Sequence, residues 1–146
     1  MATLGIDCGR VIFYPLGGEV PGAVDALRRA VDAGRFDAIH IVSRASYFNR
    51  AYFRLRLRHM RFWERTGIPR ANLHFVFRNR GKAGVCEKFG ITDFVDDRLD
   101  VLRHLRTVPR RYALAPSAKE LTELPGIIQD ANIARSWDEM AAIATS

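Results

Sequence analysis

The sequence predicts an α/β fold: a three-layer, doubly wound parallel sheet covered by helices on both faces. Short apolar, β-branched runs alternate along the chain with longer segments of helical periodicity, which is the order that parallel sheets require. A length of 146 residues and a hydrophobic fraction of 48% are enough to bury one core without disulfide staples. No repeat, low-complexity tract or linker interrupts the chain, so we expect residues 1–146 to form a single domain.

The first half of the chain predicts two strands and two helices in alternation. Residues 3–7 and 38–43 are apolar, β-branched runs typical of buried strands. Residues 22–33 and 46–66 have apolar side chains at helical spacing, and glycine or proline follows each segment as a stop signal. The segment 46–66 is the longest predicted helix.

The second half predicts four more strands and three more helices. The final helix begins at Ser136, because Glu139 three residues later completes a capping box. The other predicted helices span residues 83–89 and 98–107, and the predicted strands span residues 73–77, 93–96, 111–115 and 126–129.

Two connections limit what can cover the carboxyl edge of this sheet. The segment from Ile12 to Pro21 is rich in glycine and proline and too short for an inserted domain, so we expect a small hairpin flap. The segment between Ser43 and Lys82 holds one helix and one strand, which leaves no room for a separate cap domain.

Polar residues follow the predicted strands in a regular order. Asp7 ends the first strand, Ser43 ends the second, Lys82 lies in a glycine turn, and Asp96 and Asp97 end the fourth. The carboxyl ends of parallel strands meet at one edge, where α/β proteins bind ligands. A carboxylate nucleophile, a hydroxyl, a cation and an acidic pair are what metal-assisted phosphoryl transfer requires.

Each of these residues also has a structural explanation when it is taken alone. Asp7 can form a turn at the end of a strand, Ser43 can cap the next helix, and Lys82 can be a solvated loop residue. Asp96 and Asp97 can stabilise the start of the next helix. Their joint occurrence in order favours the functional interpretation.

Together the residues resemble the motifs of the haloacid dehalogenase (HAD) superfamily of phosphohydrolases. That family has Asp-x-Asp-x-(Thr/Val) at the end of its first strand, Ser or Thr after the second, Lys or Arg before a later helix, and an acidic pair after the fourth. The matching positions here are Asp7 to Val11, Ser43, Lys82 and the pair Asp96–Asp97. The resemblance runs from residue 3 to about residue 102 and implies a HAD-like fold with no large cap domain.

The resemblance implies a role for each position. Asp7 would attack phosphorus and form an aspartyl phosphate, and Ser43 would hydrogen-bond a phosphoryl oxygen. Lys82 would neutralise the negative charge on the phosphoryl group and on Asp7. The implied cofactor is Mg²⁺, held by Asp7, Asp96, Asp97 and the backbone carbonyl of Gly9. The implied substrate-binding residues are Arg10, Ser43, Arg44 and Lys82.

Gly9 departs from the family pattern, which has a second Asp at this position acting as general acid and base. Loss of a positioned proton donor typically lowers the rate by ~10²–10⁴-fold. Two functions therefore stay open. One is a Mg²⁺-dependent phosphatase or phosphotransfer protein weakened by this loss, and the other is a non-catalytic HAD-like protein that binds nucleic acid or another anionic partner.

The charge of the chain is carried by arginine. The formal net charge is +7, and of the 23 basic residues all but Lys82, Lys88 and Lys119 are arginine. Codon bias in a GC-rich genome explains such a composition, and so does an anionic partner, because arginine matches phosphate geometry.

Five arginines align on the predicted helix 46–66. At about 100° per residue they fall within a stripe of roughly 80°, while apolar residues including Phe48, Tyr52, Leu55, Phe62 and Trp63 lie on the other side. A solvated helix face and a nucleic-acid-binding surface are both compatible with the pattern. The stripe consists of Arg50, Arg54, Arg58, Arg61 and Arg65.

Other features indicate where the protein works. No apolar stretch approaches the ~20 residues of a membrane span, and no signal-peptide pattern opens the sequence. Cys8 and Cys86 are too few for a disulfide framework, so we expect free thiols and a cytoplasmic location.

Overall fold

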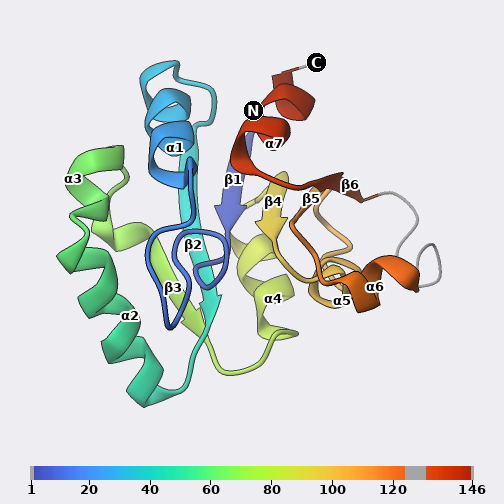
Figure 1. The fold of residues 1–146 in the computed structure, drawn as a ribbon, viewed down its shortest axis with the longest axis horizontal. Helices are drawn as coiled ribbons and strands as arrows, with labels where there is room; N and C mark the ends of the chain where they lie inside the picture. Colours follow the sequence, from blue (N-terminus) through green and yellow to red (C-terminus); the bar gives the residue numbers. More distant parts are fainter. Residues whose placement is uncertain (1, 124–130, 146) are drawn as a thin grey trace.

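The computed structural model describes residues 2–123 and 131–145 and centres on a parallel sheet of six strands (Figure 1). The strand order is β3-β2-β1-β4-β5-β6, which places β1 in the interior of the sheet. The strands are β1 (Thr3–Ile6), β2 (Ala38–Arg44), β3 (Leu73–Val76), β4 (Asp93–Asp96), β5 (Arg110–Leu114) and β6 (Asn132–Ala134).

Helices cover both faces of the sheet and bury two apolar clusters. On one face, α1, α2, α3 and α7 pack over Ile6, Ile41 and Val95. On the other face, α4 and α5 pack over Val42 and Phe94. The helices are α1 (Ala23–Asp32), α2 (Tyr47–His59), α3 (Phe62–Thr66), α4 (Gly81–Lys88), α5 (Leu99–Leu102), α6 (Ala118–Thr122) and α7 (Trp137–Thr145), with a 3₁₀ turn, η1, at Arg70–Asn72.

The predicted fold class is confirmed, because the sheet is parallel throughout and covered on both faces. Within the described part of the chain there is no large cap. The segment between β1 and α1 forms a short flap, in which Phe13 bridges to Gly9 and to Glu19 (Figure 1). The strand predicted at residues 126–129 lies outside the described residues, and β6 and α6 were not predicted.

The prediction of one continuous helix over residues 46–66 was wrong. The chain breaks between α2 and α3 at Arg61, which has a left-handed backbone with φ 55°. In an unbroken helix Phe62 would point about 180° away from Phe53, because the two residues are nine positions apart. The break allows both rings to be buried in the same cluster.

The helix predicted over residues 98–107 is also shorter than expected. The α-helical part ends at Leu102, and tight turns continue to the start of β5. The buried side chains recur every third residue, at Leu99, Leu102, Leu105 and Val108. That spacing suits turns with three residues per repeat better than an α-helix with 3.6.

The predicted start of the last helix is confirmed. The Ser136 hydroxyl accepts a hydrogen bond from the backbone N–H of Glu139 at 3.1 Å. The next residue, Trp137, is buried, and its indole N–H donates to the carbonyl of Val11 in the flap at 2.8 Å. The last helix thus anchors the flap that follows β1.

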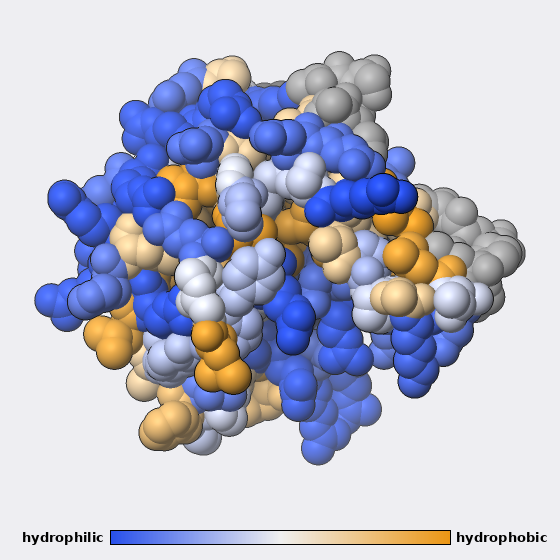
Figure 2. Space-filling model, in the orientation of Figure 1, coloured by the Kyte–Doolittle hydropathy of each residue, from blue (hydrophilic) through white to orange (hydrophobic). Residues whose placement is uncertain are grey.

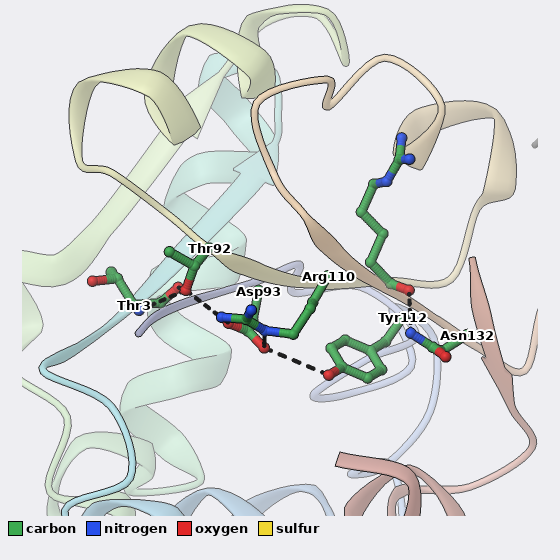
Figure 3. Close-up of polar contacts among 7 residues, drawn as sticks. Thr3, Thr92, Asp93, Arg110, Tyr112 and Asn132 are labelled. Carbon is green, nitrogen blue, oxygen red and sulfur yellow. Dashed lines mark hydrogen bonds and ion pairs between the residues drawn. The ribbon is translucent and has the colours of Figure 1, made fainter. Parts of the chain in front are cut away.

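A polar network joins the amino ends of three strands, opposite the edge that carries the predicted site (Figure 3). Asp93, which is 5% exposed, accepts two hydrogen bonds from the guanidinium of Arg110, each 2.9 Å long. Thr92 donates to the same carboxylate at 2.7 Å and accepts from the backbone N–H of Thr3 at 2.9 Å. The network links β1, β4 and β5 and has a structural role.

We expect Arg110→Ala to lower the free energy of unfolding by about 1–3 kcal/mol, because it leaves a buried carboxylate without its main donor. Urea unfolding measures the change. Arg70→Ala is the matched control, because its partner Glu64 is on the surface at 3.0 Å, and we expect a change within about 0.5 kcal/mol. Equal losses in the two variants would contradict a structural role for the network.

Candidate active site and acidic cluster

Three carboxylates gather at the carboxyl edge of the sheet. Ile6 of β1 pairs with Ile41 of β2 on one side and with Val95 of β4 on the other, so the residues that follow emerge at the same edge. Oxygen atoms of Asp7, Asp96 and Asp97 lie within 4.8 Å of one another. Among the described residues, no other group of three or more potential metal ligands is found.

Lys82 lies among these carboxylates, in the first turn of α4. Its side chain is 2% exposed, and its Nζ is 2.8 Å from Asp96 and 3.2 Å from Asp7. The sequence predicted Lys82 in a glycine turn before a helix, and the fold brings this residue to the carboxyl ends of β1 and β4. A fully buried ammonium is tolerated because both partners are charged and close.

The electrostatics show that one lysine does not balance the cluster. Burial, together with the nearby Asp96 carboxylate, raises the pKa of Asp7 to about 6, although Lys82 opposes the shift. Burial also raises the pKa of Asp96 to about 6, and burial and Asp7 raise the pKa of Asp97. Burial alone would lower the pKa of Lys82, but the attraction of Asp7 and Asp96 outweighs it and the pKa rises.

The cluster is therefore suited to a hard cation. Three carboxylates face one ammonium, and the remaining negative charge is partly suppressed by the raised pKa values. Carboxylate oxygens at this spacing are the donors that Mg²⁺ and Ca²⁺ take in proteins. The residues thus fit a divalent metal by their chemistry.

The other predicted substrate-binding residues lie around the same edge. Ser43 is buried near the end of β2, two residues beyond the pairing of Ile41 with Ile6. Arg44 is exposed at the last position of β2, and its Nε donates to the carbonyl of Phe77 at 3.4 Å. Arg10 is exposed in the flap and has a left-handed backbone with φ 64°.

Gly9 occupies the start of the flap with room for a side chain. A Cβ built at this position would meet only the ring of Pro15, at an ordinary contact distance of 3.6 Å, and Gly9 does not have a positive φ. The glycine is therefore not required by the backbone or by packing. Its consequence is chemical, because it supplies no titrating group beside Asp7.

Two residues that hold the flap were missed by the sequence analysis. Arg56 of α2 donates to the carbonyls of Tyr14 and Pro15 at 3.2 Å and to that of Gly17 at 2.5 Å. The hydroxyl of Tyr52 donates to Pro15 at 2.6 Å. Arg56 stood outside the arginine stripe and is one turn from Tyr52, a spacing that places both on one helix face, but their target could not be read from the sequence.

The arginine stripe does not form one continuous face, because Arg61 lies in the break between α2 and α3. Arg50 and Arg54 stack on aromatic rings, 4.0 Å from the centre of Phe77 and 4.9 Å from that of Phe75 respectively. Arg65 pairs with Glu19 of the flap at 2.7 Å. Phe48 and Leu55, expected on the buried side, are exposed. Nucleic-acid binding by Arg50, Arg54, Arg58, Arg61 and Arg65 stays a prediction.

Both predicted free thiols are buried. Burial raises the pKa of Cys86 to about 12 and that of Cys8 well above its ordinary value, so neither is activated as a nucleophile. None of the helices within residues 2–123 and 131–145 is long and apolar enough to cross a membrane.

Solved structures with a similar fold include two phosphatases and a haloacid dehalogenase-like hydrolase. The D,D-heptose 1,7-bisphosphate phosphatase of Burkholderia thailandensis superposes with a TM-score of 0.71 at 18% identity, over 100% of this chain and 99% of that protein. The cobalt-bound deoxy-D-mannose-octulosonate 8-phosphate phosphatase of Haemophilus influenzae gives 0.58 at 14% identity, over 98% and 86%. A haloacid dehalogenase-like hydrolase of Burkholderia xenovorans gives 0.61 at 17% identity, over 92% and 62%.

No protein-family model matches the sequence. No curated protein sequence matches it either. The predicted resemblance is confirmed at the level of the fold: the chain has the HAD-like fold, and phosphatases are among its structural neighbours.

We expect the metal-free protein to lose stability as the pH rises from about 4 to about 7. Asp7 and Asp96 have a pKa near 3.8 in the unfolded chain and about 6 in the fold. The folded state binds these protons more tightly, so their contribution to stability is present at low pH and lost through this interval. Urea unfolding in the presence of a chelator measures the slope.

In the same experiment, Asp7→Asn should make this slope less negative, because the variant lacks one of the shifted carboxyls. Asp32→Asn, which removes an exposed carboxylate on α1, should leave the slope as in the native protein. Identical slopes for the native protein and Asp7→Asn would show that burial at Asp7 does not penalise its charge.

Proposed function

We propose that the protein is a Mg²⁺-dependent phosphatase or phosphotransfer protein that uses Asp7 as its nucleophile. The observation that carries this proposal is the buried Lys82 between Asp7 and Asp96, with Asp97 beside them. A cation and three carboxylates at the carboxyl edge of a parallel sheet suit the transfer of a doubly charged phosphoryl group. The phosphatase neighbours with the same fold support a phosphorylated substrate.

In this mechanism a carboxylate oxygen of Asp7 attacks phosphorus in line. The P–O bond to the leaving group breaks, and the leaving oxygen takes the electron pair. Lys82, 3.2 Å from Asp7, offsets negative charge on the phosphoryl oxygens and on the nucleophile. Ser43 donates a hydrogen bond to a phosphoryl oxygen. Water then cleaves the aspartyl phosphate, which releases phosphate and restores the Asp7 carboxylate.

Asp7, Asp96 and Asp97 would hold Mg²⁺, together with the backbone carbonyl of Gly9. When bound, the ion polarises the phosphoryl group and screens the approach of an anionic substrate to an anionic nucleophile. The Haemophilus influenzae neighbour is a cobalt-bound form, which supports a divalent ion in a protein of this fold. The excess of carboxylates over cations in the cluster supports it independently.

Gly9 restricts which substrates the site handles well. It cannot protonate a leaving oxygen, so rapid cleavage requires a leaving group that departs as an anion, such as an aryl oxide or a carboxylate. The same residue favours the second candidate function, a non-catalytic protein that retains the pocket and binds an anionic partner. Metal binding without hydrolysis of any phosphate would favour this second function.

We expect Mg²⁺ to raise the melting temperature. A ligand at about 100 times its Kd stabilises the fold by about 2.7 kcal/mol, or roughly 5–10 °C for a protein of this size. Asp97→Asn should reduce the shift, whereas Asp100→Asn, which removes an exposed carboxylate paired with Arg103, should retain it. Calorimetry that detects no Mg²⁺ binding at millimolar concentration, with or without a phosphate analogue, would refute the metal site.

We expect the native protein to hydrolyse phenyl phosphate faster than ethyl phosphate, and Asp7→Asn to hydrolyse neither. Gly9→Asp should raise kcat/KM for ethyl phosphate by up to about 10²-fold, because it restores a proton donor where the backbone leaves room for one. Gly18→Asp places the same side chain in open space in the flap and is the matched control. Equal native rates on the two substrates would defeat this account of Gly9.

A further inference from the structure

A cavity of about 660 Å³ adjoins the acidic cluster on the side of α6. It shares Asp97 with the cluster, and its other walls come from the flap, the turn after β4 and the segment that leads into α6. Its lining holds four basic and four acidic residues together with Ala115 and Ser117: Arg10, Arg98, Arg103, Lys119, Asp97, Asp100, Glu120 and Glu123. In the view of Figure 2, hydrophilic residues gather at the lower centre and lower right of this face.

Three of the four acidic side chains of this cavity are engaged in the fold, and the fourth, Glu123, is exposed. Asp100 pairs with Arg103 at 2.8 Å. The two carboxylate oxygens of Glu120 accept the backbone N–H groups of Leu99 and Asp100, each at 3.0 Å, which ties α6 to α5. Asp97 belongs to the acidic cluster.

Three basic side chains of the cavity, unlike most of its acidic side chains, are not engaged by other described parts of the fold. Within residues 2–123 and 131–145, Arg10, Arg98 and Lys119 have no ion-pair partner. They converge on one cavity from three separate segments of the chain. Against them the lining offers one exposed carboxylate without such an engagement, that of Glu123. Three unpaired cations and one exposed carboxylate favour the binding of an anion.

Backbone conformation singles out the same cavity. Among the described residues, three that are not glycine have a positive φ, and two of them, Arg10 and Ala115, line this cavity. A left-handed backbone is unfavourable for a residue with a Cβ, and such conformations gather at functional sites. A glycine would adopt φ 64° freely, so an arginine at position 10 indicates a use for its guanidinium.

We propose that this cavity binds a second anionic group, a phosphate or a carboxylate, on the part of the substrate that is not cleaved. This inference rests on the proposed function, because it assumes that the cleaved phosphoryl group lies at Asp7. The substrate class is then a phosphate monoester with a further anionic substituent. Arg10 from the flap, Arg98 beside the acidic pair and Lys119 from α6 supply the charge that recognises it.

Three substrates built on one ring test the proposal: phenyl phosphate, 4-carboxyphenyl phosphate and 1,4-phenylene bisphosphate. With Mg²⁺ present, we expect kcat/KM to be at least about tenfold higher for one or both substrates with a second anion, since charge-assisted hydrogen bonds are strong in a partly enclosed site. The carboxylate and phosphate arms show which group the cavity prefers. No preference over phenyl phosphate would overturn the proposal.

The variant Arg10→Gly gives the sharper test. It should lower the ratio of kcat/KM between charged and uncharged substrates about tenfold while the melting temperature does not fall, because glycine adopts the left-handed backbone without strain. Lys119→Gln should lower the ratio in the same direction. Arg61→Gly is the matched control, since it removes an arginine with φ 55° in the turn between α2 and α3, and its ratio should equal the native one.

A separate readout distinguishes failure of the inference from failure of the proposed function. If no substrate is hydrolysed, calorimetry with phenyl phosphate and 1,4-phenylene bisphosphate still tests the cavity. Binding of the bisphosphate about tenfold more tightly by the native protein, lost in Arg10→Gly, would support the cavity and reject catalysis. Equal affinities for the two compounds would reject the cavity.

Discussion

The burial of Lys82 between Asp7 and Asp96 is the interaction on which the functional edge depends. An ammonium with 2% exposure is stable only beside opposite charge, and two buried carboxylates need a cation in turn. Asp7 follows β1, Lys82 lies in α4 and Asp96 ends β4, so the charge requirement is met only when these three elements come together. One lysine among three carboxylates still leaves a deficit of positive charge, which is why the same cluster that organises the edge is suited to a divalent ion.

The flap after β1 is positioned beside this site by contacts with distant parts of the chain. It is too short to carry a core of its own, and it is held by residues far away in the sequence: Tyr52 and Arg56 of α2 bind its carbonyls, and Trp137 of α7 binds Val11. The loop that begins directly after Asp7 is thereby fixed against two helices. A rigid flap suits a site whose cover is small, because the position of Gly9 and Arg10 relative to the acidic cluster is then set by packing.

Gly9 and Arg10 change the chemistry of that loop in opposite ways. A Cβ at Gly9 would make only an ordinary contact with Pro15, so neither the backbone nor close packing requires a glycine at this position. Arg10 holds a strained backbone while it places a cation at the neighbouring cavity. Under the proposed function, Gly9 would remove a proton donor for the leaving group and Arg10 would add a cation beside the acidic cluster.

The sequence alone determined the parallel α/β fold and the residues of the acidic cluster. Strand ends such as Asp7, Ser43 and Asp96 are visible as polar residues after apolar runs, and parallel pairing brings all such ends to one edge. Tertiary structure decided the features that depend on contacts between distant segments. The break at Arg61 follows from burying Phe53 and Phe62 together, and the tight turns after Leu102 follow from packing against the sheet. The hydrogen bonds of Arg56 to the flap and the cavity beside α6 could not be predicted from the sequence for the same reason. Each depends on which distant segments meet in space, and local periodicity carries no information about such contacts.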